Sequence, residues 1–365
     1  MDEAETHFDD LLMRLESECT AQFQADGGHV SRAPSRGLGG LLDLLTLSEL
    51  LERSEHGVPE FIARWINRVG AMARFFQAGD GALLVFNDGY ESRPEAVAAA
   101  IDRLTAPARR FMVAPKSGFH KLEKDGVLLM LDAGRAPEQP FGDWAHAGAL
   151  AFDLHDGPAR LVTSCASSPE VDVDWQAAVR RTSAHSTLVL SGHDSSPFRM
   201  NEETRLLYPE GPEGISAKRL EEANEIWLDA QHGGYKGNHG MLHRRRLFMS
   251  GDGSRLTGED SLARPVSQGP AVDAEPIPYD IRFHLHPTVT ATLRGESIHL
   301  QTESGVSWRF KASGSSARLE KTVYLGRGVV ERSRQIVLSG LADADSDGSV
   351  PPNCVRWAFL REPAL

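Results

Sequence analysis

The sequence predicts an α+β protein, with a partial (α/α) toroid of N-terminal helices followed by a large antiparallel β-sandwich. Before residue 110, apolar residues recur every three or four positions, as they do on one face of a helix. After residue 110 the apolar period falls to two, as in half-buried strands. A chain of 365 residues exceeds one average domain. We therefore expect a helical domain over residues 1–109 and a sheet domain over residues 110–365.

Four helices are expected in the first part of the chain. In each of them the spacing of three and four places the apolar residues on one side. The third begins at Pro59, because proline is favoured in the first helical turn. The expected helices cover residues 5–24, 38–53, 59–76 and 94–104.

The second part of the chain consists of short strand-like runs separated by Gly, Asp, Ser and Pro residues. Many runs of this kind favour antiparallel sheets that pack face to face. Two longer stretches, 250–280 and 340–353, are rich in glycine, serine, proline and acidic residues and are predicted to be loops. The expected strands cover residues 127–132, 149–155, 159–164, 186–191, 226–231, 243–249, 280–286, 289–294, 297–302, 306–312, 318–325, 333–339 and 355–360.

The composition excludes several classes of partner. The formal net charge is −12, whereas general nucleic-acid binders and binders of anionic membranes need a basic face. We expect no nucleic-acid partner, although a local arginine cluster could still bind an acidic glycan. Three cysteines without paired spacing predict neither a disulfide framework nor a zinc-cysteine site. No apolar run has the length of a membrane span, so no membrane insertion is expected.

The N-terminal residues bear on where the protein resides. They begin Met-Asp-Glu-Ala-Glu and lack a basic segment followed by an apolar stretch, so no signal peptide is visible. As written, the sequence predicts a cytoplasmic protein.

Two segments each place a histidine just before a predicted strand. His146 precedes an alternating run that includes Leu150, Phe152 and Leu154, and His185 precedes the largely apolar run 187–190. A histidine at a strand entrance can project from the rim of a sheet toward a ligand. We expect the two histidines to lie close together on one rim of the sandwich.

These segments resemble motifs of a known family. His-Ala-Gly-Ala-Leu-Ala-Phe over 146–152, followed by Arg-Arg-Thr-Ser-Ala-His-Ser-Thr over 180–187, resembles the C-terminal β-domain of heparinase II/III-like polysaccharide lyases. The resemblance covers about residues 26–359 and likens the predicted helices to the last turns of an (α/α) toroid. A full toroid needs more helices than this chain holds.

The resemblance implies cleavage of an acidic, uronate-containing glycan by β-elimination. It also implies a place in the cell envelope or periplasm, which an incomplete N-terminus would reconcile with the missing signal peptide. β-Elimination needs a base for the C5 proton, a group that neutralises the adjacent carboxylate, and an acid for the departing O4. The resemblance assigns proton transfer to His146 and a supporting role to His185.

The loop after the first helix resembles a family loop that carries an acid and a tyrosine. In this sequence Ser31 occupies the position of the acid, and Arg36 occupies the position of the tyrosine. His29 then becomes a candidate base, and Arg32 a candidate clamp for the substrate carboxylate. We expect both side chains to face His146 across the junction between helices and sheet. The alternative is a histidine that packs a helix end and an arginine that serves as a surface charge.

Four further residues are candidate substrate contacts. Asn87 and Tyr90 follow the third helix, in what could also be an ordinary Asp-Gly turn. Trp144 opens the first histidine segment, and Tyr235 follows a pair of glycines. Loops on a rigid scaffold often carry binding residues of these types.

Residues 243–246 read His-Arg-Arg-Arg within a predicted strand. Alternation places His243 and Arg245 on one face and Arg244 and Arg246 on the other. One pair could bind a sulfate or carboxylate through two hydrogen bonds. The alternative is a ladder of ion pairs across neighbouring strands.

A metal is not expected. The metal version of the family uses a His-x-His-x-Asp sequence, but here Trp144 stands at the first histidine and Gly148 at the aspartate. Thr163 stands at a second aspartate position. Two histidines without a carboxylate are an incomplete zinc shell, so we expect no cofactor, with zinc as the minor alternative.

The absence of the tyrosine, the aspartate and most of the toroid supports another class of function. The chain would then be a non-catalytic glycan-binding or cell-envelope structural module derived from a lyase.

Overall fold

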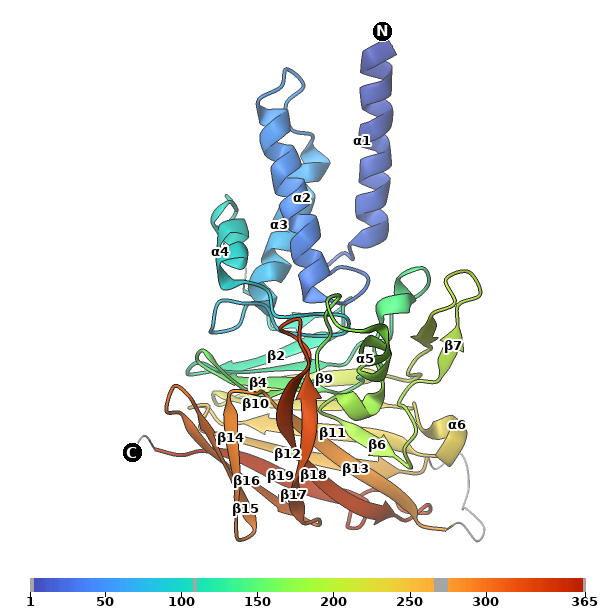
Figure 1. The fold of residues 1–365 in the computed structure, drawn as a ribbon, viewed down its shortest axis with the longest axis vertical. Coiled ribbons are helices and arrows are strands. Elements are labelled where there is room, and N and C mark those ends of the chain that lie inside the picture. The colour runs from blue at the N-terminus through green and yellow to red at the C-terminus, as the bar shows by residue number, and fades with distance from the viewer. Residues whose placement is uncertain (1–2, 108–109, 266–274, 364–365) are drawn as a thin grey trace.

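A computed structural model describes residues 3–107, 110–265 and 275–363 of the chain. Four helices stand together on one side of a stack of β-sheets (Figure 1). The helices match the four expected ones to within a few residues at each end. They are α1 (Glu3–Gln22), α2 (Pro34–Glu52), α3 (Glu60–Phe76) and α4 (Pro94–Asp102).

A nine-stranded antiparallel sheet lies next to the helices. Its order is β1-β2-β3-β4-β5-β13-β18-β17, and β6 also pairs with β13. The strands are β1 (Val113–Ala114), β2 (Phe119–Lys124), β3 (Val127–Asp132), β4 (Phe152–Asp156), β5 (Ala159–Thr163), β6 (Leu188–Leu190), β13 (Ile277–Leu285), β17 (Ala317–Tyr324) and β18 (Glu331–Ala342).

An eight-stranded antiparallel sheet forms the other layer, in the order β14-β15-β16-β19-β12-β11-β10-β9. Its strands are β9 (Ser216–Glu222), β10 (Glu225–His232), β11 (Leu242–Met249), β12 (Arg255–Ala263), β14 (Val289–Arg294), β15 (Ser297–Thr302), β16 (Ser307–Ser313) and β19 (Cys354–Arg361). The smaller elements are η1 (Phe141–Trp144), α5 (Val173–Ala178), η2 (Thr182–Ala184), α6 (Lys236–His239) and the hairpin β7 (Phe198–Met200) with β8 (Leu207–Pro209).

Strand β3 shows how the layers are joined. Alternate residues of a strand point to opposite faces, and every residue of β3 is buried. Leu129 and Leu131 lie in the core between the two sheets. Leu128 and Met130 lie in a second core that the helices share with the nine-stranded sheet. The helices therefore cover the outer face of this sheet, which confirms the predicted arrangement of helices followed by an antiparallel sandwich.

One predicted loop was wrong. Residues 250–280 contain β12 and the start of β13, while 266–274 lie outside the described residues. The inward face of β12 includes Gly258 and the buried Asp260, so its apolar alternation is interrupted. Asp260 can be buried because Arg245 and His243 bind its carboxylate, at 2.8 and 2.7 Å. A strand whose central inward positions are a glycine and an aspartate does not show the period on which the prediction rests.

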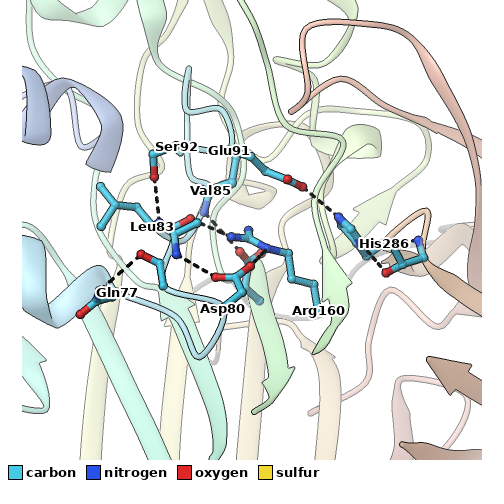
Figure 2. Close-up of polar contacts among 12 residues, drawn as sticks. Gln77, Asp80, Leu83, Val85, Glu91, Ser92, Arg160 and His286 are labelled. Carbon is cyan, nitrogen blue, oxygen red and sulfur yellow. Dashed lines mark hydrogen bonds and ion pairs between the residues drawn. The ribbon is translucent and has the colours of Figure 1, made fainter. Parts of the chain in front are cut away.

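A group of charged residues, here called the junction clamp, ties the segment between α3 and α4 to the nine-stranded sheet (Figure 2). Asp80 pairs with Arg160 of β5 at 2.7 Å. Glu91 lies 2.9 Å from His286, and the Tyr324 hydroxyl donates to it at 2.7 Å. Burial opposes the charge on Glu91, but these hydrogen bonds and the nearby cation hold its pKa well below the usual range.

Candidate functional site

The two histidine segments are held together by side chains of the second, which bond to backbone carbonyls of the first. The acceptors are alternate residues of the first segment, and the bonds join residues 35, 35 and 38 positions apart, so the segments run side by side. Cross-links of this type satisfy backbone groups that no strand partner reaches. The bonds run from Arg180 Nε to the Ala145 carbonyl at 3.0 Å, from Thr182 Oγ1 to Ala147 at 2.7 Å and from Thr187 Oγ1 to Ala149 at 2.8 Å.

This arrangement brings His146 and His185 together, as the sequence predicts. Their ring centroids lie 5.2 Å apart, in an edge-to-face orientation. Both side chains are more than nine-tenths buried. Burial lowers the pKa of His185 to about 4, and burial with the nearby His185 and Arg180 lowers the pKa of His146 well below its usual value. Both rings are therefore neutral at pH 7.

The hydrogen bonding of the pair is incomplete. Within the described residues, neither ring nitrogen of His146 has a hydrogen-bond partner, and Nε2 of His185 also has none. Buried polar atoms are nearly always bonded, so exceptions call for an explanation. A neutral imidazole with an unused lone pair can accept a proton or a ligand's hydrogen bond.

Arg245 of β11 fixes the turns that follow the two histidines. Its Nη1 donates to the carbonyls of Leu150 and Ser186, at 2.8 Å in each case. Its other nitrogens bind Asp260, and both side chains are fully buried. The eight-stranded sheet thus holds the backbone of the site in place through Arg245. The predicted faces of the 243–246 strand are confirmed, but nothing in the sequence marked Arg245 as a support for the histidines.

Three residues around the site have strained backbones. Arg32, Asn87 and Leu150 have φ values of 60°, 52° and 59°, in the left-handed region that non-glycine residues seldom occupy. The Asn87 side chain accepts from the His146 amide at 3.2 Å and donates to the Arg32 carbonyl at 3.0 Å. Strained residues of this kind persist where the surrounding structure holds them, often next to functional sites.

Comparison with known proteins identifies the family. The heparinase II/III-like C-terminal domain family matches residues 106–358. This chain belongs to the heparinase II/III-like family. The match contains both histidine segments and the whole of the sheet region up to β19.

A relative of this family member is the FtsZ-localized protein C of Caulobacter vibrioides. The two are 33% identical over 365 residues, which cover 97% of this chain and 61% of the relative. The chain therefore spans about three-fifths of the length of that curated relative.

Solved structures of polysaccharide lyases share the fold. A heparan sulfate lyase of Pedobacter heparinus matches with a TM-score of 0.71 and 13% identity, over 96% of this chain and 55% of that one. A heparinase III structure matches with a TM-score of 0.72 and 14% identity, over 98% of this chain and 54% of that one. A chondroitin AC lyase of Streptomyces coelicolor matches with a TM-score of 0.51 and 12% identity, over 93% of this chain and 54% of that one. At these identities the likeness shows the fold alone.

The family's zinc site does not fit this chain. Gly148 replaces the expected aspartate, and a Cβ atom there would lie 3.0 Å from Nδ1 of His185, closer than ordinary van der Waals contact. Thr163 is buried at the second aspartate position. No cluster of three or more His, Cys, Asp or Glu side chains in the described ranges is arranged to hold a metal ion. We therefore derive no chemistry through a metal.

Arg32 is not the free carboxylate clamp that the sequence predicts. Its guanidinium is buried, forms an ion pair with Asp132 and donates from Nε to the Ser117 carbonyl at 2.9 Å. Its link to the His146 segment runs through its own carbonyl and Asn87. A buried arginine that already has a carboxylate partner cannot neutralise a second one without breaking the first pair.

His29, the other candidate base, is neutral as a base must be, but one of its ring nitrogens is already bonded. Burial and Arg36 lower its pKa to about 4, so the ring is neutral. Its Nδ1, however, accepts from the Ser31 amide at 3.1 Å and lies 2.7 Å from the Ser31 hydroxyl. The lone pair that a base would use is therefore occupied, and the remaining ring nitrogen is a donor. Its role in proton transfer stays a prediction.

Two of the four expected substrate contacts are structural. Tyr235 is fully buried, and its hydroxyl donates to the Leu188 carbonyl at 2.6 Å. Asn87 is also buried, and both ends of its amide are used within the chain. Tyr90 and Trp144 remain available, since they are 41% and 40% exposed. Arg36 covers one face of the Trp144 ring, with its guanidinium carbon 4.3 Å from the centroid.

Arg180 is a candidate that the sequence reasoning missed, although it opens the second motif. Its Nε holds the Ala145 carbonyl, while Nη2 is buried without a hydrogen-bond partner in the described part of the chain. Burial lowers the pKa of Arg180 to about 10, so it remains a cation at neutral pH. It lies close enough to His146 to influence the pKa of that ring.

Proposed function

We propose that the protein binds an acidic, uronate-containing polysaccharide where the helices meet the sheet, and that His146 is the general base for β-elimination there. The observation that carries the proposal is the His146 ring, which is buried and neutral, with both nitrogens unused within the described residues. In the reaction, His146 takes the C5 proton and the released electron pair forms the C4–C5 double bond. The bond from C4 to the glycosidic oxygen breaks, and the imidazolium returns the proton to that oxygen.

Two neighbours support this chemistry. Nη2 of Arg180, which has no hydrogen-bond partner among the described residues, can oppose the substrate carboxylate as negative charge develops in the transition state. His185 packs edge to face against His146 and, because it is neutral, does not compete as a second cation. The hydrogen bonds between the two motif segments hold these three groups close together.

The test is the ultraviolet absorbance of the unsaturated uronate that elimination creates. Purified protein is assayed with alginate, heparin, heparan sulfate and chondroitin. Removing a general base typically costs about 10²–10⁴ in rate, so His146→Ala should lose activity by that factor. His7→Ala, at an exposed position on α1, is the matched control. An active wild type whose rate survives His146→Ala would contradict the assignment of the base.

A second candidate is a non-catalytic module that acts at the division site. Two observations favour it. The Arg32 cation is already neutralised by Asp132, and a relative with 33% identity is named for its localisation with FtsZ. The module would bind an acidic glycan without cleaving it and would associate with FtsZ. Glycan binding without elimination product, together with co-sedimentation with FtsZ filaments, would support this candidate over the lyase.

No helix in the described ranges combines the length and hydrophobicity needed to cross a membrane.

A further inference from the structure

The outer face of the eight-stranded sheet carries a row of aligned side chains that the junction site does not use. The inward positions of this sheet belong to the core between the layers, so the alternate positions point away from the sandwich. In the register of the strands, each member of the row lies opposite the next. From β10 to β16 the row reads Trp227, Phe248, Thr257, Ala358 and Lys311.

The row forms a groove with an aromatic end. Trp227 is 36% exposed, and its ring centroid lies 5.1 Å from that of Phe248. Beyond these rings the small side chains of Thr257 and Ala358 leave the surface hollow. The groove has a volume of about 610 Å³. This volume is within the range of small-ligand sites, which spans about 300–1,000 Å³.

A second row, two residues along each strand, forms a charged wall of the groove. Glu259 forms an ion pair with Arg246 at 2.6 Å and accepts a hydrogen bond from Arg356 at 2.9 Å. Lys311 lies at the far end of the apolar row and is exposed. Three cations and one carboxylate thus line the groove, in a chain whose formal net charge is −12. The groove therefore carries an excess of positive charge on an acidic protein, although both arginines also pair with Glu259.

The aromatic and charged parts together specify the chemistry of the ligand. The face of an aromatic ring carries negative charge density and packs against the weakly positive C–H face of a pyranose. The arginines present N–H donors that match carboxylate or sulfate oxygens. A ligand that satisfies both parts is a chain of sugar rings with acidic substituents.

We propose that this groove, lined by Trp227, Phe248, Arg356 and Lys311, is a second, non-catalytic binding site for an acidic oligosaccharide. It lies across the sandwich from the junction, because the helices cover the other sheet. The site anchors a glycan chain independently of the residues that surround His146. The inference goes beyond the proposed activity and would hold even if no elimination occurs.

The test compares three probes by isothermal titration calorimetry. An alginate hexasaccharide has both acid groups and sugar rings, cellohexaose has rings alone, and polyphosphate has charge alone. We expect the alginate hexasaccharide to bind more tightly than either of the others. Trp227→Ala should weaken its binding about tenfold, as for a central aromatic contact. Trp227→Phe, which keeps a ring, should retain most of the affinity.

Leu293→Ala is the matched control, since Leu293 is 50% exposed on β14 at the opposite edge of the same sheet. Hydrogen exchange locates the bound oligosaccharide. Protection of residues 225–232 and 242–249 supports the groove, and it should persist in His146→Ala. Protection confined to 144–152 and 180–187 would overturn the groove while leaving the junction proposal intact. Equal binding of polyphosphate, or unchanged affinity in Trp227→Ala, would also overturn it.

Discussion

Gly148 makes room for His185, since the space that a side chain would need is occupied by the imidazole ring. The Cβ of an alanine would lie 3.0 Å from Nδ1 of His185 and 3.1 Å from Cγ. Overpacking a well-filled interior costs about 1–3 kcal/mol, so Gly148→Ala should lower the free energy of unfolding by that amount. Denaturant titration gives the value.

Gly39→Ala is the control for this change. It lies in α2, and a Cβ there would meet nothing within 4 Å. Alanine is the better helix former by about 1 kcal/mol, so this variant should be neutral or more stable. A Gly148→Ala protein as stable as wild type would mean that the His185 ring moves aside without cost.

Arg245 gives a sharper prediction, because its removal leaves Asp260 charged and buried. Breaking a buried ion pair from one side costs about 3–5 kcal/mol, so Arg245→Met should be strongly destabilised in denaturant titration. The neighbouring Arg244 pairs with Asp229 at the surface. Exposed pairs contribute about 0–1 kcal/mol, so Arg244→Met should have little effect. Equal losses in the two variants would show that the burial of Arg245 does not matter.

These residues also show what the sequence could predict about the site. Strand alternation separated His243 and Arg245 from Arg244, and the two motifs predicted the approach of His146 to His185. The local pattern could not say which face of the strand was buried. The partner of Arg245 is Asp260, which lies in a segment that was predicted to be a loop. Contacts between residues distant in sequence leave no periodic signal.

Among the elements, strands with a mainly apolar or an alternating sequence were predicted best. The expected strands 127–132, 289–294 and 297–302 coincide with β3, β14 and β15. By contrast β9, with the sequence Ser-Ala-Lys-Arg-Leu-Glu-Glu, is an edge strand with mostly exposed residues and was missed. Its place in the sheet comes from pairing with β10, which tertiary structure supplies and propensity does not.

The segment between α3 and α4 depends on the junction clamp. Glu91→Gln keeps the shape of the side chain but removes its charge. Tyr324, His286 and Arg327 all donate hydrogen bonds to the Glu91 carboxylate. The amide nitrogen of a glutamine is itself a donor, so it could not accept from them. An unsatisfied buried group costs about 1–3 kcal/mol, so the midpoint of thermal unfolding should fall.

Glu95→Gln, at an exposed position on α4, removes the same charge without these contacts and serves as the control. Matching melting temperatures for the two variants would show that the clamp does not stabilise the fold.

For the whole molecule, the buried histidines predict loss of stability in acid. Burial lowers the pKa to about 4 in His120 and His185 and to about 3 in His284, while an unfolded histidine titrates near 6.5. Between pH 7 and pH 4 the unfolded chain therefore binds protons that the folded chain does not, so stability falls as pH falls. Asp153 acts in the opposite direction, because burial raises its pKa to about 7.

The histidines outnumber this carboxyl. We expect the melting temperature to be about 2–3 °C lower at pH 5 than at pH 7.5, as for a loss of about two kcal/mol in a protein of 365 residues. Scanning calorimetry at both values measures the difference, and His185→Gln should reduce it. A melting temperature that is flat over this range would refute the titration argument.

Strand β3 has a consequence for how the molecule can be divided. Both of its faces are buried, one toward the helices and one toward the second sheet. Separation of the two parts after a cut between α4 and β1 would leave Leu128, Met130 and Phe119 of the sandwich open to water, and the helices would lose the sheet on which they pack. The helical and sheet regions, which the sequence distinguishes by a change of apolar period, therefore share a core and do not form two independent units.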